Sequence, residues 1–455
     1  MRFRVLLLAV CCWLSAVSAQ WLETSIRVAY WPVALCYNPQ NVKVYCACLA
    51  SYPGTVAIID GASNSVIGSL NVGENPVDVC YNAQDNKVYC ASEDGTLTVI
   101  DGASNQVIRT VRVGTQPASL CYNPQADRIY CANYAGRNVT VIAGGSDSVI
   151  AFVAADFGPE ALCYNPQDNK VYCANWDGNT VTVIDCASNR AETTLSVGSY
   201  PGALCYNPQN DRVYSANWGS NTVTVVDGAS NQTVATIPAG SEPIALCYNL
   251  HNNNVYCADY TGDSVTAIDG ALNQVLARIA VGSSPCVLAC SPESGKVYCA
   301  NSIGNSVSVI SSTNEVLRTI GVESGPCALV WNPAWGRMYV ADGGTDSLTV
   351  IRDSGGGGVT EHKSISSALP PIAATIVRGE LRLPQAPSIK PQASNCLLDI
   401  SGRTVLDLHP GTNDVSRLAP GVYFVSERWV VTPLAVAKPH GQRSAVSVRK
   451  VVIQR

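Results

Sequence analysis

LCYNPQDNKVYCAN, residues 162–175, recurs with small changes along most of this 455-residue chain. The first cysteine of the stretch returns at intervals of 40 to 44 residues, and a valine stands in the eighth place. Self-similarity at such a period is typical of repeat folds in which each copy is one supersecondary unit. The repeated positions are Cys36, Cys80, Cys121, Cys163, Cys205, Cys247, Cys290 and Val330.

Each repeat contains four short segments that are rich in β-branched and aromatic residues. ALCYN, KVYCA and TVTVID are bounded by Asn, Pro and Gly, and a fourth segment such as VIRTVRV (residues 107–113) follows them. This pattern predicts four antiparallel strands in about 42 residues, the size of one β-propeller blade. We therefore predict an all-β chain with an eight-bladed β-propeller of four-stranded blades.

The two ends of the repeat region predict how the ring closes. Residues 23–32, ETSIRVAYWP, match the fourth strand and proline that precede every other unit. The last unit, residues 326–351, has three strands and lacks the fourth. The N-terminal strand is thus expected to complete the last blade and remove an open sheet edge. A seven-bladed ring is the alternative, if one end unit lies outside it.

The chain divides into four segments. Residues 1–19 combine a basic start, an apolar run and small residues before Gln20, which predicts a secretory signal peptide rather than a transmembrane span. We predict a propeller at 20–353, a Gly/Ser/Pro-rich linker at 354–374 and a second domain at 375–455. Charged residues make up 14% of the chain and the net charge is −5, so nothing indicates nucleic-acid binding.

The repeat resembles the YVTN β-propellers of bacterial and archaeal surface proteins. The matching tetrapeptides are YCAN, YSAN, YCAD and YVAD, with TVTVID beside them, and the resemblance covers residues 23–351. It implies display at the cell surface or secretion, and an interaction role rather than a defined reaction. Function does not follow from a propeller fold alone.

The C-terminal segment resembles the sorting domain of proteins exported by type IX secretion. Residues 399–403, 418–423 and 450–453 carry the similarity, although residues 432–445 are longer and richer in proline than that family's hairpin. The resemblance implies a small β-sandwich that engages the secretion machinery and delivers the chain to the outer surface. The expected signal residues are Gly402, Gly421, Tyr423, Lys450 and Val451.

The paired cysteines suggest a structural role. We expect Cys163 to lie opposite Cys173 across a five-residue turn, which leaves strained disulfides and buried free thiols as open alternatives. Two thiols fall short of a zinc site, so no metal is predicted. The candidate pairs are Cys36/Cys46, Cys80/Cys90, Cys121/Cys131, Cys163/Cys173, Cys247/Cys257 and Cys290/Cys299.

One face of the predicted ring carries loops that differ between copies and contain large aromatic residues. Such residues offer contact area together with a polar group, which favours a platform for a glycan or a protein or peptide ligand. The alternative is that each ring packs on the loop of the next blade. The candidates are Trp31, Tyr134, Phe157, Trp176, Tyr200, Trp218 and Tyr260.

Nothing in the sequence supports a catalytic centre or a cofactor. The chain has four histidines, and only His251 lies in the repeats, in an expected turn. No Ser/His/Asp arrangement or phosphate loop is present, so we predict no catalytic residues and no cofactor. The alternative is a propeller-type lyase or quinoprotein-like oxidoreductase with its site at the channel mouth.

Overall fold

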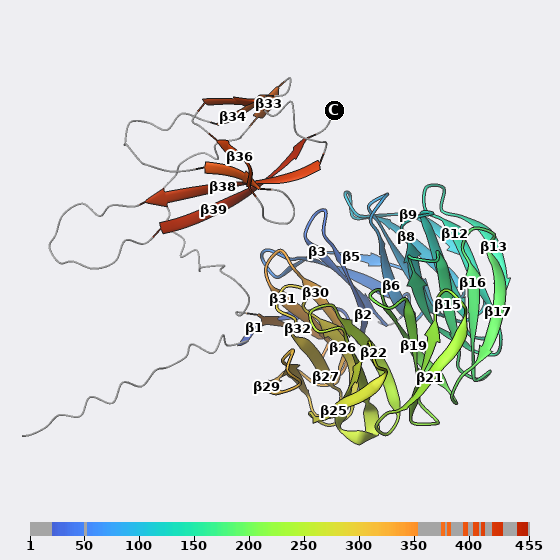
Figure 1. Cartoon of the computed structure of the whole chain (residues 1–455). Coiled ribbons are helices and arrows are strands. Elements are labelled where there is room, and N and C mark those ends of the chain that lie inside the picture. The colour runs from blue at the N-terminus through green and yellow to red at the C-terminus, as the bar shows by residue number, and fades with distance from the viewer. Residues whose placement is uncertain are drawn as a thin grey trace, which may run out of the picture. The chain divides into compact units, whose positions relative to one another are not determined.

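The computed structural model describes residues 21–49 and 52–353, together with seven strands between residues 375 and 453. The chain forms two compact units, Met1–Gly358 and Val359–Arg455 (Figure 1). The first unit is the predicted propeller, and it has eight four-stranded antiparallel sheets. The eight-bladed prediction is therefore confirmed. The expected signal peptide and linker lie outside the described residues.

Blades are numbered here from 1 to 8 in chain order, and each begins with an innermost strand. The innermost strands are β2 (Pro32–Asn38), β6 (Pro76–Asn82), β10 (Pro117–Asn123), β14 (Pro159–Asn165), β18 (Pro201–Asn207), β22 (Pro243–Asn249), β26 (Pro285–Cys290) and β30 (Pro326–Asn332). Each contacts the innermost strands of both neighbouring blades, so the eight strands form a closed circle.

The second and third strands carry most of the buried residues. The second strands are β3 (Lys43–Cys48), β7 (Lys87–Ser92), β11 (Arg128–Asn133), β15 (Lys170–Asn175), β19 (Arg212–Asn217), β23 (Asn254–Asp259), β27 (Val297–Asn301) and β31 (Arg337–Asp342). The third strands are β4 (Thr55–Asp60), β8 (Thr96–Asp101), β12 (Asn138–Ala143), β16 (Thr180–Asp185), β20 (Thr222–Asp227), β24 (Ser264–Asp269), β28 (Ser306–Ile310) and β32 (Ser347–Arg352).

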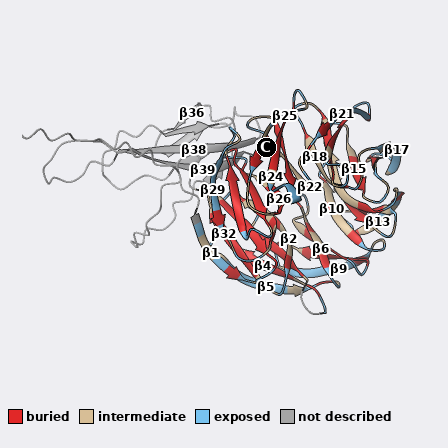
Figure 2. Ribbon diagram, turned by 90° about the horizontal axis from the view of Figure 1, so that it is seen from below, coloured by how far each residue is buried: buried red, intermediate tan, exposed pale blue. Residues whose placement is uncertain are grey.

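The outermost strands are largely exposed, as the pale blue segments of Figure 2 show. They are β5 (Ser65–Asn71), β9 (Gln106–Arg112), β13 (Ser148–Ala154), β17 (Arg190–Ser196), β21 (Gln232–Pro238), β25 (Gln274–Ala280) and β29 (Val316–Gly321), with β1 (Trp21–Arg27) in blade 8. One short 3-10 helix, η1 (Tyr260–Gly262), follows β23.

In seven of the eight blades, the hydroxyl of a buried second-strand tyrosine makes a hydrogen bond to the next blade. The Tyr172 hydroxyl donates to the carbonyl of Gly228 and to Asn231 Oδ1, at 3.3 and 3.1 Å, in the turn after β20. The Lys170 ammonium donates to the same two groups. The turn that follows each third strand therefore has a structural role: it accepts hydrogen bonds from the preceding blade. A buried hydroxyl requires such a partner.

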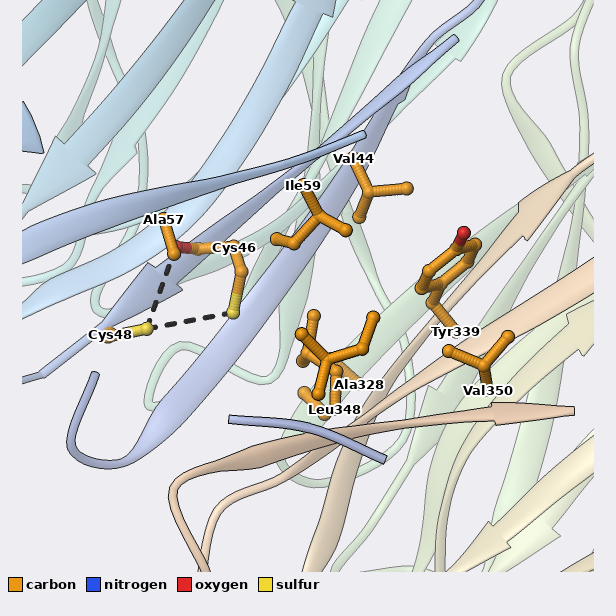
Figure 3. Close-up of a cluster of buried hydrophobic side chains, with 11 residues drawn as sticks. Val44, Cys46, Cys48, Ala57, Ile59, Ala328, Tyr339, Leu348 and Val350 are labelled. Carbon is orange, nitrogen blue, oxygen red and sulfur yellow. Dashed lines mark hydrogen bonds between the residues drawn. The ribbon is translucent and has the colours of Figure 1, made fainter. Parts of the chain in front are cut away.

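Apolar residues of adjacent blades fill the space between the sheets. Figure 3 shows the contact between blades 8 and 1, where Val44 and Ile59 face Tyr339 and Val350. Each sheet is therefore covered on both faces, and its inner strands read as continuous apolar runs. The fully buried tyrosines are Tyr45, Tyr89, Tyr130, Tyr172, Tyr214, Tyr256, Tyr298 and Tyr339.

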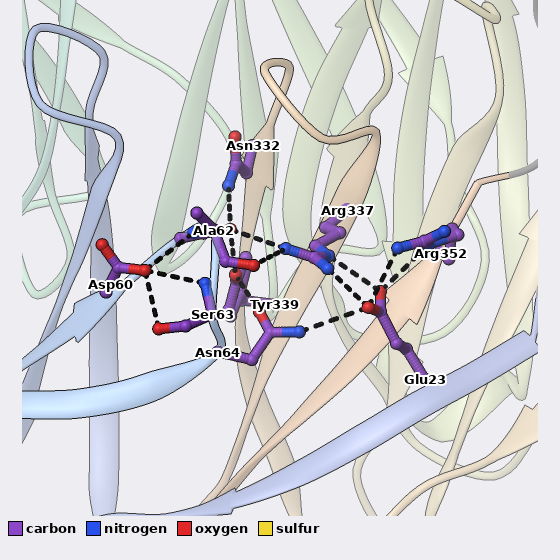
Figure 4. Close-up of polar contacts among 10 residues, drawn as sticks. Glu23, Asp60, Ala62, Ser63, Asn64, Asn332, Arg337, Tyr339 and Arg352 are labelled. Atoms are coloured by element: carbon purple, nitrogen blue, oxygen red, sulfur yellow. Dashed lines mark hydrogen bonds and ion pairs between the residues drawn. The ribbon is translucent and has the colours of Figure 1, made fainter. Parts of the chain in front are cut away.

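The N-terminal strand closes the ring as predicted. β1 pairs antiparallel with β32, and Ser25 lies opposite Thr349. Glu23 accepts hydrogen bonds from Arg337 Nε at 2.8 Å and Arg352 Nη2 at 3.0 Å (Figure 4). One carboxylate from the N-terminal strand thus joins two arginines of blade 8.

The expected register of the cysteine hairpins is wrong by one residue. In blade 4, Leu162 lies opposite Cys173 and Cys163 lies opposite Tyr172. Opposed residues share a sheet face, so the two thiols point to opposite faces and cannot bridge. The same offset separates Cys36/Cys46, Cys80/Cys90, Cys121/Cys131 and Cys247/Cys257. In blade 7, Cys290 lies opposite Val297 and Cys299 lies opposite Leu288, so these two cysteines are diagonal neighbours rather than a facing pair. All the described cysteines are free thiols.

The second unit contains two antiparallel sheets. One has the order β33 (Thr375–Val377), β34 (Glu380–Leu383), β37 (Gly411–Asp414), and the other β36 (Thr404–Leu408), β35 (Asn395–Leu398), β38 (Gly421–Val430), β39 (Ser444–Ile453). Gly421 and Tyr423 lie in β38, Lys450 and Val451 lie in β39, and Tyr423 is paired with Val451. Gly402 lies outside the described residues. No helix in the described parts is long and apolar enough to cross a membrane.

Candidate ligand-binding site

The variable loops lie on one face because the start of each first strand is opposite the end of the second strand, and backbone hydrogen bonds join the loops in pairs. In blade 4, the Trp176 amide donates to the Gly158 carbonyl at 2.7 Å, which ties the turn after β15 to the loop before β14. In blade 5, the Trp218 amide donates to the Tyr200 carbonyl at 3.0 Å. The aromatic residues of these loops therefore occupy fixed positions on one side of the ring.

Three of the predicted aromatic residues form a cluster, here called the aromatic triad: Trp176, Tyr200 and Trp218. The ring centroids of Trp176 lie 5.5 Å from Tyr200 and 5.8 Å from Trp218, and Tyr200 lies 6.1 Å from Trp218. Interplanar angles are 36°, 34° and 68°, within the tilted and edge-on arrangements that aromatic pairs favour. Tyr200 is 41% exposed and both tryptophans are half-buried, so solvent reaches the cluster mainly at Tyr200.

Two glycines make room for the triad. A Cβ at Gly202 would lie 2.7 Å from Cζ3 of Trp176, and one at Gly219 would lie 2.4 Å from Cδ2 of Tyr200. Sequence reasoning missed both glycines. A signal was present: the other copies carry Val33, Val77, Ala118, Glu160, Ile244, Cys286 and Cys327 where blade 5 has Gly202.

The backbone of Tyr200 is strained. Its φ is 55°, in the left-handed region that disfavours residues with a Cβ. The residue before the first-strand proline has a positive φ in every blade, and Trp31, with φ 56°, is the other aromatic there. The left-handed residue before this proline is thus a feature of the repeat, and blade 5 places a large, exposed ring there.

The other predicted aromatic residues lie outside the triad. Tyr134 donates to Asp177 Oδ2 at 2.8 Å, and this bond, with burial, raises the pKa of its hydroxyl to about 12. The Arg137 guanidinium lies 3.4 Å from the ring centroid of Phe157. Trp31 packs edge-on against Tyr30 in blade 1, and Tyr260 begins η1 in blade 6.

The asparagines that end the second strands have structural roles. Asn175 is fully buried, and its Nδ2 donates to Thr180 Oγ1 and Thr182 Oγ1 at 3.0 and 2.9 Å. These bonds close the hairpin at the residue directly before Trp176. Asn133, Asn217 and Asn301 make equivalent bonds to hydroxyl groups.

The described residues show no cluster of acidic, histidine or cysteine side chains suited to a metal ion. His251 lies in the turn after β22, and its Nε2 is 2.6 Å from the Pro292 carbonyl oxygen. A polar depression lined by Ser25, Arg27 and Glu323 lies on blade 8, whereas the triad belongs to blades 4 and 5. The aromatic triad therefore offers stacking surfaces to a ligand.

Comparisons with solved structures support the fold. Dihydro-heme d1 dehydrogenase NirN, in a structure in complex with DHE, is 16% identical with a TM-score of 0.61, over 70% of this chain and 72% of that one. The computationally designed Ika8 protein is 18% identical with a TM-score of 0.62, over 73% of this chain and all of the design. No curated protein matches this sequence.

A family model supplies the assignment. The model of YNCE-like beta-propellers matches residues 3–246, more than half of the chain, and the match runs from the N-terminal region into blade 6. Sequence repeats, eight four-stranded blades and this match agree with one another. The chain belongs to the YNCE-like beta-propeller family.

Proposed function

We propose that this chain is an exported binding module whose ligand docks on the aromatic triad. The observation that carries the proposal is the meeting of Trp176, Tyr200 and Trp218 on the variable-loop face, with Tyr200 41% exposed. The other copies carry larger residues where blade 5 has Gly202, and this glycine leaves space for the Trp176 ring. Blade 5 is thus the copy at which large rings can gather on the variable-loop face.

The triad suits a ligand with flat, weakly charged surfaces. Its three side chains are neutral, so recognition would come from ring stacking and from the hydroxyl and indole N–H groups. Tilted rings over two blades form a platform that suits an extended ligand. We favour a glycan, whose sugar rings present apolar faces and hydroxyl edges, and a peptide is the other outcome of the test.

A glycan and peptide array probed with the full chain tests the proposal. Trp176→Ala and Trp218→Ala are expected to abolish or strongly weaken the wild-type signals. Phe152→Ala is the matched control, because Phe152 is 60% exposed on the outermost strand β13, away from the loop face. Wild-type signals that persist in both tryptophan variants would exclude the triad as the binding surface.

An enzyme is the second candidate, and no observation favours it. NirN is named as a dihydro-heme d1 dehydrogenase, but 16% identity carries the fold alone. The site residues support binding better than catalysis.

We also propose that residues 1–19 direct export and that the C-terminal unit sorts the chain to the surface. The support is the signal-peptide layout and the similarity of residues 399–403, 418–423 and 450–453 to sorting domains. In a host with type IX secretion, deletion of residues 448–455 is expected to leave the chain in the periplasm. Normal surface delivery of that variant, detected by protease shaving of intact cells, would refute the sorting role.

A further inference from the structure

In most blades, the first-strand cysteine packs against a tyrosine of the following blade. Cys36 of blade 1 shares a core cluster with Tyr81 of blade 2, and Cys121 of blade 3 shares one with Tyr164 of blade 4. Each of these tyrosines directly follows the cysteine of its own copy in the CYN sequence. Adjacent innermost strands therefore meet where the cysteine of one blade lies beside the tyrosine of the next.

Blade 7 departs from this pattern by one residue. In blade 6, Cys247 lies opposite Tyr256, whereas in blade 7 the residue opposite Tyr298 is Ala289. Ala289 thus occupies the cysteine position of the repeat, and Cys290 occupies the position that Tyr248 has in blade 6. The sequence-based assignment of Cys290 as the seventh copy of the repeat cysteine is therefore wrong.

The consequence is a contact between two thiols at the junction of blades 6 and 7. The Sγ atoms of Cys247 and Cys290 are 3.1 Å apart, on the adjacent innermost strands β22 and β26. A disulfide requires about 2.05 Å, so approach by about 1 Å would allow the bond. Both residues are half-buried, whereas Cys257 and Cys299 on the second strands are fully buried.

We propose that Cys247 and Cys290 are a disulfide site that joins blades 6 and 7 when the chain meets a small disulfide oxidant. The thiolate of one residue attacks a sulfur of the oxidant, releasing one reduced thiol and leaving a mixed disulfide. The thiolate of the second residue then attacks the protein sulfur and releases the other half of the oxidant as a thiol. Two thiols lose two protons and two electrons, and the oxidant is reduced to two thiols.

The bond would cross-link innermost strands whose contact is otherwise non-covalent. The hydrogen bond between the two thiols, together with burial, raises the pKa of Cys247. Because the thiolate is the attacking species, oxidation should be slow at neutral pH and faster at alkaline pH. This site is independent of the aromatic triad, so its test does not depend on the proposed ligand.

Peptide mapping of the full chain tests the proposal directly. The reduced protein is incubated with oxidised glutathione, free thiols are alkylated under denaturing conditions, and the digest is analysed by mass spectrometry. The expected product is one cross-linked peptide that contains Cys247 and Cys290, two hydrogens lighter than its reduced parts. Recovery of both residues as alkylated thiols, or as separate glutathione adducts, would overturn the proposal.

Two variants separate the thiol pair from general oxidation. Cys290→Tyr restores the residue of the other copies at this position, so the contact should pack as it does elsewhere while the cross-link disappears. Tyr248→Cys repeats the blade 7 arrangement one junction earlier, next to Cys205, whose thiol lies beside the Tyr248 backbone. That variant should gain a second cross-link, between residues 205 and 248. A Cys290→Tyr protein that still cross-links Cys247 to another cysteine would contradict the assignment.

Discussion

Trp176 of blade 4 lies directly against Gly202 of blade 5, so closely that a Cβ at Gly202 would come within 2.7 Å of the indole ring. The contact joins the turn after one second strand to the next innermost strand. It shows that the aromatic triad depends on a close approach of ring and backbone. A residue without a side chain is therefore part of the candidate site.

Gly202→Ala is expected to displace Trp176 and disturb the triad. The backbone of Gly202 has no positive φ, so the added methyl group acts through the ring contact alone. The near-ultraviolet circular dichroism and the tryptophan emission should change while the far-ultraviolet spectrum is retained. Gly68→Ala is the control, because its nearest contact would be Ile58 Cδ1 at 3.7 Å, an ordinary distance. Identical spectra for the two variants would show that the Trp176 ring has room for a methyl group at residue 202.

Glu23→Gln should destabilise the closure of the ring. The variant removes the charge that pairs with Arg337 and Arg352, and the Arg337 side chain is only 5% exposed. A lost hydrogen-bonded charge pair of this kind costs about 2 kcal/mol of unfolding free energy. Denaturant unfolding of the variant and the wild type measures the difference. Equal midpoints would mean that backbone pairing of β1 with β32 closes the ring unaided.

Glu23 also predicts a loss of stability in acid. Burial raises its pKa, but the hydrogen bonds and charges of Arg337 and Arg352 outweigh burial and leave the pKa below its ordinary value of 4.5. The stabilisation is therefore complete above pH 4.5 and disappears as the pH falls through the folded-state pKa. The difference in unfolding free energy between the wild type and Glu23→Gln should therefore shrink as the pH falls from 4.5 through the folded-state pKa. A gap that widens in acid would contradict this sign.

Asp342→Asn should stabilise the protein at neutral and alkaline pH. Asp342 occupies the place of Asn175 at the end of its second strand, and its Oδ1 has no hydrogen-bond partner. Burial raises the pKa of this carboxyl from 3.8 to about 7, so the folded chain loses stability as the pH rises between these values.

The amide would donate to Thr349 as Asn175 donates to Thr182, and we expect a gain of about 1–2 kcal/mol at pH 8 that shrinks towards pH 4. Thermal unfolding of both proteins at the two pH values measures this gain. A variant less stable than the wild type at pH 8 would show that the ionised carboxylate is tolerated.

The fold could be predicted from the sequence because the same pattern of strands and turns recurs in eight copies. Blade number and closure by the N-terminal strand both follow from the repeat and from its incomplete last copy. The sequence predicts the wrong hairpin register because the expected five-residue turn includes Lys170. It pairs with Asn165, and the turn has four residues that end at Asn169 with φ 52°. A turn of four residues in place of five shifts every facing pair of the hairpin by one position.

The candidate site could be predicted only in part. Loop variability identified the aromatic residues. Which of them meet in the triad depends on Gly202 and Gly219, because a Cβ at either position would overlap a ring of the triad. The role of Cys290 could not be predicted because this cysteine lies one residue from the repeat position, which Ala289 occupies. Placing Ala289 in the repeat gives intervals of 42 and 41 residues around it, closer to the other copies than the 43 and 40 obtained with Cys290.

The most direct test of the account is the affinity of the best array ligand for the full chain and its variants, measured by isothermal titration calorimetry. Loss of one stacking ring should weaken binding by about 1–3 kcal/mol, roughly 5- to 150-fold, in Trp176→Ala and Trp218→Ala. Phe152→Ala should bind as the wild type does. Equal affinities in all four proteins would contradict the claim that the aromatic triad is the binding surface.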